Sequence, residues 1–579
     1  MKGIILSCLL FLWITYAFAQ QQSPAWKMNA KLGRGINMGN AFEAPSEKEW
    51  GNEWKPEYFE IISDLGFDHV RVPVRWESAD RSMAVAPYTI YPSFFSRIKT
   101  VVDKAIAEDL RIIINMHHHD LLLSDPVGQK ARFLSQWRQI ADFFKDYDND
   151  KLLFEVLNEP HGTISPQMWN AYFAEALAEI RKTNPDRIVL MGTAEYGGLS
   201  GIAHLDLPED DKLIVSPHFY SPFRFTHQGA EWVGGEADSW LGTQWFDTED
   251  ERETIINEFA PAIAFSAKHD VPIHVGEFGA YQKADLESRV RWTTFLARWF
   301  EEQQMSWAYW EFSAGFGIYN PSKKEILQPL ADALLVNEMR EPVKVERMLL
   351  YKSDFSSGTD GWTLQVQQGA SATLRAASNM LNVNVTGGGQ EPWHIQLIKT
   401  GINMVEGKRY RLSVTAKAPT QRNIGFYIGR SQSPWSAYSG YGSGQLSPTA
   451  SVHRATFMMT GSTDPAARLV IDLGNAVVGV EVLEVRLEEI LDVITSVSNI
   501  ELPTLQYFPN PVISYLNLKN IMDYQQVFLY DLQGKNLGHY QIQGNDGQID
   551  LQKYPKGLYV LKLIGRANQP SKSIKIFKD

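Results

Sequence analysis

The chain has 579 residues and a formal net charge of −12, with 44% hydrophobic and 21% charged residues. One hydrophobic core does not organise a chain of this length, so several domains are expected. The composition excludes a disordered chain, and the negative charge disfavours nucleic acid and anionic membranes as partners, because both are polyanions.

The first residues have the pattern of a secretory signal peptide, which we predict to cover residues 1–19. Lys2 supplies the positive charge, residues 4–14 form an apolar run too short to span a bilayer, and small residues flank position 18. The single cysteine, Cys8, lies in this segment, so we expect no disulfide in the mature chain. We predict no membrane span elsewhere.

Short apolar runs alternate with helical patterns between about residues 31 and 340. The runs lie at residues 35–38, 69–73, 111–116, 152–157, 187–191, 213–216, 272–275 and 306–309. Helical spacing of apolar residues occurs at residues 93–109, 129–147, 166–183, 251–269 and 285–304. Eight strand–helix units of this kind predict an α/β fold, a (β/α)₈ TIM barrel, within residues 20–345.

After residue 342 the helical periodicity gives way to short runs in which apolar and polar residues alternate, as at residues 381–385 and 410–414. Glycine and serine clusters separate the runs. This pattern predicts that two smaller all-β sandwich domains follow the barrel, at residues 349–491 and 505–579, with a connector around residues 495–503.

Polar residues follow the predicted barrel strands at the end where such barrels place their active sites. They are Arg71, His117, His118, Asn158, Glu159, His218, Tyr220, Glu277 and Trp310. Glu159 and Glu277 come from the fourth and seventh strands and would face each other across the barrel mouth. Cleavage of a glycosidic bond needs two carboxyl groups, one to protonate the leaving oxygen and one to attack or to activate water. A lone glutamate at a strand end is commonly a surface residue, but this joint pattern is hard to explain by packing.

Two further features suggest other readings. Three consecutive histidines, residues 117–119, could suggest a metal site, but neighbouring residues on a strand point to opposite faces. We therefore predict neither a catalytic metal nor a cofactor. Glu155 lies four residues before Glu159 on the same strand, so we interpret it as a core or inter-strand contact.

Seven stretches resemble glycoside hydrolase family 5, in family order and with plausible spacing. They are GRGINMGNAFE (33–43), VRVPVRW (70–76), INMHH (114–118), LNEP (157–160), HFY (218–220), GEFG (276–279) and AYWEF (308–312). A further stretch, FTHQGAEW (225–232), resembles a branch that contains bacterial endoglucanases, some of which also cleave mannan.

The resemblance implies a retaining mechanism in which Glu159 is the general acid/base and Glu277 the nucleophile. Glu159 would need a raised pKa, and Glu277 would have to stay ionised. Arg71 and Tyr220 would hold Glu277, and His218 would lie beside Glu159.

The resemblance also implies a set of sugar-binding residues. Asn158 would bind the 2-hydroxyl, His117 and His118 would contact sugar hydroxyls, and Trp310 would be the stacking platform. Further cleft positions match Asn40, Glu43, His227 and Trp232. His119 has no such match, and we interpret it as structural or loop-facing. Glu311, beside Trp310, is also interpreted as structural.

Residues 349–491 are similar to β-sandwich carbohydrate-binding modules. Trp393, Trp435 and Tyr438 are the candidates for stacking on sugars, whereas Trp362 is expected in the core. The alternative is a sandwich whose tryptophans are structural and bind no ligand.

Residues 505–579 resemble the C-terminal sorting domain of the type IX secretion system. The matching stretches are YFPNPV (507–512), LYDLQGK (529–535) and PKGLYV (555–560). The resemblance implies a Gram-negative bacterium, export across the outer membrane, and release from or attachment to the cell surface.

The leading hypothesis is thus a secreted, monomeric endo-β-1,4-glucanase that acts on cellulose or β-glucan. A β-mannanase, or a mixed glycanase with the same site, is the nearest alternative. A non-catalytic surface carbohydrate-binding protein and a metal-dependent hydrolase are more distant ones.

Overall fold

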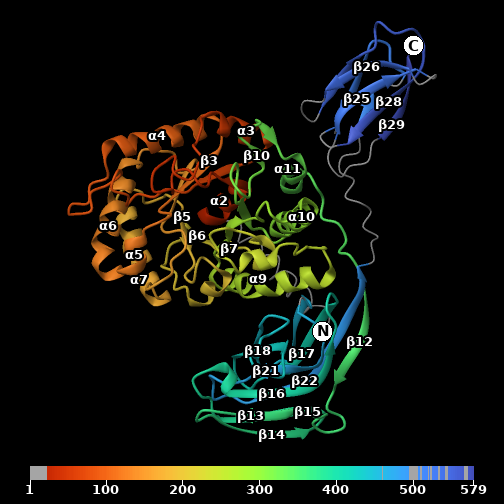
Figure 1. Ribbon diagram of the computed structural model, residues 1–579. Helices are drawn as coiled ribbons and strands as arrows, with labels where there is room; N and C mark the ends of the chain where they lie inside the picture. Colours follow the sequence, from red (N-terminus) through yellow and green to blue (C-terminus); the bar gives the residue numbers. More distant parts are fainter. Residues whose placement is uncertain are drawn as a thin grey trace, which may run out of the picture.

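The structure is a computed structural model that describes residues 23–578, except residues 460, 494–505, 509–510, 520, 522–523, 532–534, 542–545 and 566–571. The predicted signal peptide and the predicted connector therefore lie outside the described residues. In chain order, the described part consists of an α/β barrel, a β-sandwich and a smaller all-β unit (Figure 1). The predicted fold class is confirmed.

Within the described residues, the barrel is a nine-stranded parallel sheet with the order β6-β5-β4-β3-β2-β1-β9-β8-β7. Its strands are β1 (Arg34–Asn37), β2 (His69–Val72), β3 (Arg111–Asn115), β4 (Leu152–Glu155), β5 (Val189–Gly192), β6 (Leu213–Ser216), β7 (His218–Phe219), β8 (His274–Phe278) and β9 (Ser306–Tyr309). A bridge between Val215 and Ile273 closes the barrel. Only Pro217 separates β6 from β7, so the two strands occupy one of eight positions around the barrel.

Helices surround the strands. They are α3 (Glu57–Leu65), α4 (Pro92–Ala107), α5 (Asp120–Ser124), α6 (Pro126–Phe143), α7 (Pro166–Arg181), α8 (Phe223–Thr226), α9 (Glu249–His269), α10 (Leu286–Glu302) and α11 (Gln328–Leu335). One more helix, α2 (Pro24–Leu32), packs Ala25, Met28 and Leu32 against Ile113 and Leu153 inside the barrel. Because α2 precedes β1, it covers the end of the barrel opposite the active-site end.

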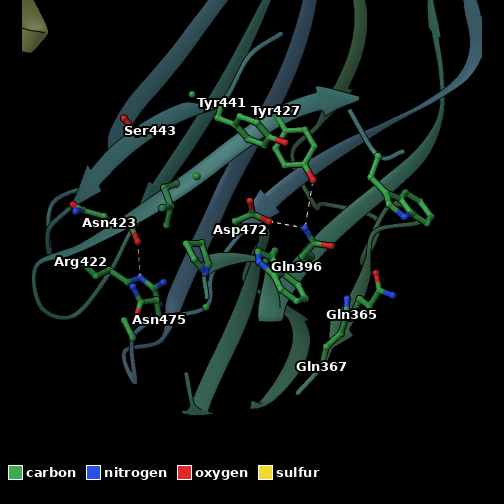
Figure 2. A pocket seen from close by; sticks show the side chains of 18 of the residues that line it. Gln365, Gln367, Gln396, Arg422, Asn423, Tyr427, Tyr441, Ser443, Asp472 and Asn475 are labelled. Atoms are coloured by element: carbon green, nitrogen blue, oxygen red, sulfur yellow. Dashed lines mark hydrogen bonds between the residues drawn. The ribbon is translucent and has the colours of Figure 1, made fainter. Parts of the chain in front are cut away.

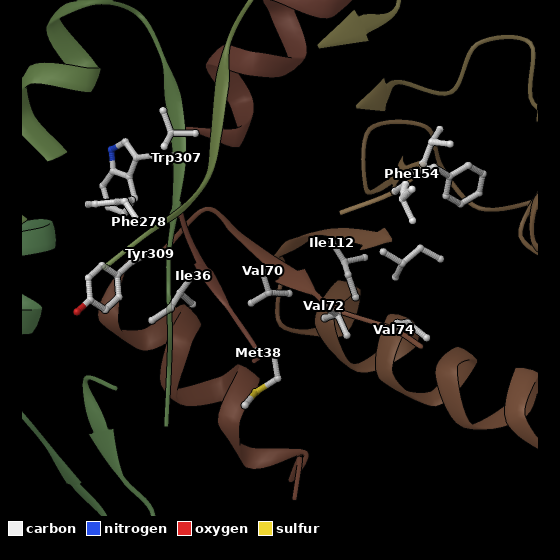
Figure 3. Close-up of a cluster of buried hydrophobic side chains, with 14 of the residues drawn as sticks. Ile36, Met38, Val70, Val72, Val74, Ile112, Phe154, Phe278, Trp307 and Tyr309 are labelled. Atoms are coloured by element: carbon white, nitrogen blue, oxygen red, sulfur yellow. The ribbon is translucent and has the colours of Figure 1, made fainter. Parts of the chain in front are cut away.

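Alternation along the strands gives the barrel an apolar outside and, beyond the apolar layer that α2 covers, a polar inside. Ile36, Val70 and Ile112 face outward, and Figure 3 shows them in the layer between strands and helices. Their neighbours Asn37, Arg71, Asn115 and Glu155 are fully buried in the interior. The strand register pairs Asn37 with Arg71 and Asn115 with Glu155. The sheet therefore brings polar side chains from four strands to one level of the interior.

Caps explain where two helices begin. α9 starts at Glu249, two residues before the predicted start, because the Thr248 side chain accepts a hydrogen bond from Glu251 N in a capping box. α6 starts at Pro126, because Asp125 caps it and proline is favourable in the first turn.

The sandwich packs a six-stranded sheet against a five-stranded sheet. The first contains β12 (Val345–Ser353), β14 (Ser371–Ala377), β15 (Met380–Gly387), β17 (Arg409–Lys417), β20 (Ser451–Met458) and β22 (Val480–Val493). The second contains β13 (Thr363–Val366), β16 (Ile395–Met404), β18 (Arg422–Gly429), β19 (Gly442–Leu446) and β21 (Asp464–Asp472). Trp362 is buried between them, where we expected it, and its indole N–H donates to the Tyr351 hydroxyl at 2.9 Å.

The last unit has a three-stranded and a four-stranded antiparallel sheet around a common apolar core. The strands are β23 (Gln506–Phe508), β24 (Tyr515–Lys519) and β27 (Gly547–Asp550), then β26 (Asn536–Gln541), β25 (Tyr524–Tyr530), β28 (Gly557–Gly565) and β29 (Lys572–Lys578). Among the residues described, no helix combines the length and hydropathy that a membrane span requires.

Candidate active site

The guanidinium of Arg71 lies at the centre of the polar barrel interior. Its Nε donates to Glu155 Oε2 at 2.6 Å, and its Nη1 donates to Asn37 Oδ1 at 2.8 Å and to Glu277 Oε1 at 2.7 Å. Its Nη2 donates to Asn158 Oδ1 at 2.6 Å. Burial opposes the charge of Arg71, but the carboxylates of Glu155 and Glu277 outweigh it and raise its pKa. Arg71 is therefore a permanent buried cation.

Glu277, on β8, is held by a donor on each of its oxygens. Arg71 donates to Oε1, and the Tyr220 hydroxyl donates to Oε2 at 2.9 Å. Burial and the charge of Glu277 raise the pKa of Tyr220 well above its usual range, so this phenol stays protonated. The two donors fix the orientation of the Glu277 carboxylate.

Glu159 follows β4 and lies opposite Glu277, with His218 between them. His218 Nδ1 is 2.7 Å from Glu159 Oε1 and 3.7 Å from Glu277 Oε2. One oxygen of each glutamate lies within 4.8 Å of the other. Gly197 packs its backbone against this pair, and a Cβ there would lie 2.9 Å from Glu159 Cγ, so the close approach requires glycine.

The protonation of these three groups is linked. Burial opposes ionisation of Glu159, but the hydrogen bond and charge of His218 outweigh it and lower the Glu159 pKa. Burial raises the pKa of Glu277, and the charge of Glu159 adds to this effect. Burial opposes a charge on His218, yet Glu277 and Glu159 raise its pKa. The raised pKa that we expected for Glu159 is thus not found in the free site, because the hydrogen bond to His218 favours the ionised carboxylate.

Trp310 and His117 form one wall of the site. Their rings stack at a centroid distance of 5.7 Å and an interplanar angle of 14°. A Cβ at Gly39 would lie 2.9 Å from the Trp310 ring, so the sequence needs glycine there. The neighbouring Glu311 is fully buried, accepts from Ala314 N at 2.9 Å, and has a pKa raised to about 8 by burial, as suits a structural role.

The three consecutive histidines diverge. His117 faces Trp310, the ring of His118 lies 5.9 Å from the exposed ring of Trp50, and His119 Nδ1 accepts from Leu122 N at the start of α5. Burial lowers the pKa of each of the three imidazoles. The three rings therefore do not converge on one point. Strand alternation is not the reason, because β3 ends at Asn115 and the three histidines follow it.

Glu43 and Asn40 lie near Glu277. The Glu43 carboxylate accepts hydrogen bonds from Asn40 N and from Ala41 N, and burial raises its pKa to about 7. The charge of Glu277 contributes to this rise.

His227 and Trp232 come from the loop between α8 and α9. The His227 ring lies 5.0 Å from the Tyr220 ring, and burial lowers its pKa to about 4. Trp232 is 60% exposed, and its ring centroid lies 6.2 Å from that of His227. Together with the wall of Trp310 and His117 and with the pair of Asn40 and Glu43, these residues surround the carboxyl groups of Glu159 and Glu277.

The sequence did not predict which side chains hold Arg71 in place. It placed Glu155 correctly as an inter-strand contact but did not foresee its bond to Arg71, and it gave no role to Asn37. Asn37 also donates to the carbonyl of Gly276 at 2.9 Å, one residue before Glu277. Polar residues at inward positions of otherwise apolar strands were the signal that could have found both.

Glu159, His218 and Glu277 are also the cluster, within the described residues, whose donor atoms converge enough for a metal ion. Those atoms already have partners in the protein. His218 and Glu159 bond to each other, and Arg71 and Tyr220 donate to Glu277. The proton shared by His218 and Glu159, the Tyr220 hydroxyl proton and the charge of Arg71 thus compensate the negative charge of the two carboxylates, which a metal cation would otherwise balance.

A second candidate site is a cleft of about 1000 Å³ on the outer face of the five-stranded sheet (Figure 2). Gln396 donates to Asp472 Oδ1 at 2.7 Å on its floor. Trp393 and Trp435 line it and are 40% and 50% exposed. The Arg468 guanidinium lies 4.6 Å from the Trp435 ring centroid.

The prediction for Tyr438 needs correction. Its ring packs against the sandwich core, and its hydroxyl donates to Asp464 Oδ2 at 2.9 Å, so it does not line the cleft. Tyr427 and Tyr441 line the cleft instead, with ring centroids 4.9 Å apart. The Gly/Ser-rich sequence around Tyr438 indicated an exposed loop but not the direction of each side chain.

Three family models match the chain in succession. Residues 33–315 match "Cellulase (glycosyl hydrolase family 5)" and residues 348–477 match "Carbohydrate binding domain". Residues 506–577 match "Secretion system C-terminal sorting domain".

Similar proteins match over the barrel. Endoglucanase H of Acetivibrio thermocellus is 34% identical over 286 residues, which are 49% of this chain and 30% of that protein. Endoglucanase A of Ruminococcus albus is 31% identical over 300 residues, 47% of this chain and 78% of that protein. The chain spans 30% and 36% of the lengths of two of these relatives, Endoglucanase H and the cellulase/esterase CelE of A. thermocellus.

Solved structures of Cel5A from Thermotoga maritima, in complex with mannotriose and with cellobiose, are 46% identical to this chain. Each match has a TM-score of 0.52 and covers 54% of this chain and 99% of the other.

The linkage of His218 to the two glutamates can be measured without any assay of activity. In protein labelled with ¹³C-histidine, we expect the His218 ring to titrate above its ordinary pKa of about 6.5. Glu159→Gln should lower this midpoint, because it removes a negative charge that stabilises the imidazolium while burial remains. His218→Asn identifies the resonance, and Glu195→Gln, near the exposed His204, is the control. A midpoint unchanged by Glu159→Gln would contradict the linkage.

Proposed function

The chain belongs to the cellulase family of glycosyl hydrolases, family 5, and we propose that it hydrolyses internal β-1,4 bonds of cellulose and related β-glucans with retention of configuration. The distance between Glu159 and Glu277 supports retention. Their nearest oxygens lie within 4.8 Å. Retaining glycosidases have carboxyl groups about 5–5.5 Å apart, whereas inverting enzymes need about 6.5–9.5 Å to fit a water molecule.

In the first step, Glu277 attacks the anomeric carbon, and the bond from that carbon to the leaving sugar oxygen breaks. Arg71 and Tyr220 hold the attacking carboxylate in position. Glu159 donates a proton to the leaving oxygen, so the leaving part of the polysaccharide departs as an alcohol. The other part of the polysaccharide is then esterified to Glu277.

The proton for this step comes from the hydrogen bond between His218 and Glu159. In the free site, the imidazolium of His218 carries it. A sugar bound over Glu159 removes water from that carboxylate and disfavours its charge, so the proton moves along the 2.7 Å bond to Glu159. Glu277 then remains as the anion, stabilised by its two donors.

In the second step, Glu159 removes a proton from water, and the resulting nucleophile releases the sugar from Glu277. The ester has removed the charge of Glu277, which is one of the charges that raise the pKa of His218. The proton taken from water therefore stays on Glu159 while the ester lasts, and it returns to His218 when the carboxylate of Glu277 is freed and the product leaves.

The sugar chain would bind along the residues around this pair. Asn158, held by Arg71, would bind the 2-hydroxyl, and His117 and His118 would contact other hydroxyls as neutral rings. Trp310 would stack on a sugar face. Four further cleft residues would extend the binding surface: Asn40, Glu43, His227 and Trp232.

β-1,4-Mannan is a second candidate substrate. The observation in its favour is the T. maritima Cel5A structure with mannotriose, because that protein is 46% identical over 99% of its length. Glucose and mannose differ only in the orientation of the 2-hydroxyl, so the same carboxyl groups can cleave both linkages.

We propose that residues 20–345, 349–491 and 505–579 have separate tasks. The barrel cleaves, the sandwich binds the polysaccharide through Trp393 and Trp435, and the last unit interacts with the type IX secretion machinery of a Gram-negative bacterium. A signal peptide at residues 1–19 would precede export to the surface or medium. A single chain would suffice, because the groups described above come from one barrel.

Product analysis on a panel of polymers tests the proposed activity. We expect cleavage inside the chains of carboxymethyl cellulose and barley β-glucan, which should lower the viscosity quickly. In ¹H NMR, the first products to appear should have the β-configuration. Glucomannan and galactomannan in the same panel test the second substrate. Products that are first of α-configuration would contradict retention, and an inert β-glucan would contradict the proposed glucanase.

The roles of the two glutamates can be separated from their effect on folding. Glu277→Ala and Glu159→Ala should each reduce turnover of β-glucan by at least about 100-fold, because one removes the nucleophile and the other the proton donor. The melting temperature should stay close to that of the wild type. Glu236→Ala, at an exposed loop position, is the control. Near-normal turnover by either of the first two variants would show that the assignment is wrong.

The corrected sandwich cleft makes a further prediction about binding. In a Glu277→Ala background, which prevents hydrolysis, Trp435→Ala should weaken binding to β-glucan by about tenfold or more, as loss of a central aromatic contact does. Tyr438→Phe loses only the bond to Asp464 and should bind normally. Affinity electrophoresis on β-glucan measures both, and the opposite ranking would restore the original assignment of Tyr438.

A further inference from the structure

The barrel and the sandwich contact each other at α9, which lies on the side of the barrel next to the sandwich in Figure 1. Asp250, in the first turn of α9, is only 3% exposed. It accepts from Arg347 Nη2 at 2.8 Å and from Arg411 Nη1 at 2.5 Å, and both arginines belong to the sandwich. Arg454 of the sandwich pairs with Glu253 one turn further along. A buried carboxylate with two cationic partners is costly to separate from them, so the contact is persistent.

A second set of contacts holds the residues just before this turn. The Arg409 guanidinium lies 4.3 Å from the ring centroid of Phe246, and its Nη2 is 3.7 Å from Glu251 Oε1. Glu251 in turn accepts from Thr248 N at 2.8 Å and from Phe246 N at 3.2 Å. The sandwich therefore contacts both the side chains and the capping structure of residues 246–251.

These arginines all belong to one sheet of the sandwich. Arg347 is on β12, Arg409 and Arg411 are on β17, and Arg454 is on β20. The cleft with Trp393 and Trp435 lies on the other sheet. Docking to the barrel thus leaves the cleft open.

The docked segment directly follows the loop that carries His227 and Trp232. Gln228 closes this loop, because its Nε2 donates to the carbonyl of Thr243 at 2.8 Å and its Oε1 accepts from Gly242 N at 2.8 Å. Trp245, next to Phe246, is buried, and its backbone N donates to Ser288 Oγ at 3.0 Å. One end of the loop thus lies against the sandwich contact.

The other end lies against the catalytic groups. The ring of His227 is 5.0 Å from that of Tyr220, and the Tyr220 hydroxyl donates to Glu277. Thr226, just before the loop, donates its hydroxyl proton to the carbonyl of Tyr220 at 2.6 Å. A shift at residues 246–251 is therefore connected through a short, packed segment to the sugar-binding wall.

We propose that the sandwich is a positioning element of the catalytic cleft: by docking on residues 246–251 it fixes the loop of residues 227–245, and so holds His227 and Trp232 against the bound sugar chain. This inference rests on the proposed function. It distinguishes the sandwich from a module that only brings the barrel to its polymer. Loss of docking then weakens the hold on a soluble oligosaccharide, even one too short to reach the sandwich cleft.

The test uses the full chain and cellotetraose as substrate. The double variant Arg347→Ala/Arg411→Ala and the single variant Asp250→Asn remove the contact from the two sides. KM should rise about 3- to 10-fold with little change in kcat, because the loop binds ground state and transition state alike. The control is Lys417→Ala on the same strand, which removes only a 2.9 Å pair with Glu481 inside the sandwich.

Binding of β-glucan by the sandwich and the melting curve verify that each variant is folded. If the double variant fails this check, Asp250→Asn, which preserves shape, still gives the result. A KM equal to that of the wild type in a folded docking variant would overturn this inference but leave the proposed function standing. A wild-type chain that cleaves neither cellotetraose nor β-glucan would overturn the proposed function, and the inference with it.

Discussion

Arg71 donates hydrogen bonds to Glu155, Asn37, Glu277 and Asn158 from one fixed position inside the barrel. A buried guanidinium needs anions beside it, and β4 and β8 each supply one. The cation therefore determines where the carboxylate of Glu277 lies and how Asn158 is turned. Because two carboxylates contact one cation and Glu159 lies close by, the site carries excess negative charge, and His218 takes up the proton that offsets it.

This balance explains why one pair of carboxyl groups can perform two roles. Glu277 has donors on both oxygens, and these stabilise the anion that the proposed first step requires. Glu159 bonds to His218, a group that can give up its proton and recover it. The electrostatics of the free site do not by themselves assign the donor. In the proposed mechanism the bound sugar does so, since it would desolvate Glu159 and leave Glu277 in contact with Arg71 and Tyr220.

The sequence predicted the features that depend on local pattern. The eight apolar runs locate the barrel strands within a few residues, and residues at their ends meet in the site. Contacts between distant side chains were not predictable in this way. The pairing of Arg71 with Glu155, the inward turn of Tyr438, and the docking of Arg411 on Asp250 each depend on the relative placement of elements that are far apart in the chain. The lowered pKa of Glu159 likewise depends on the position of the His218 ring.

The central claim is that Glu277 becomes covalently bonded to the sugar during turnover. A 2-deoxy-2-fluoro-β-cellobiosyl fluoride tests it directly, because the fluorine at C2 slows both steps and the good leaving group lets the first proceed. Peptide mass spectrometry of the treated protein should find one fluorocellobiosyl group on the peptide that contains Glu277. Labelling of Glu159 or another residue, or loss of fluoride with no labelled peptide, would contradict the account.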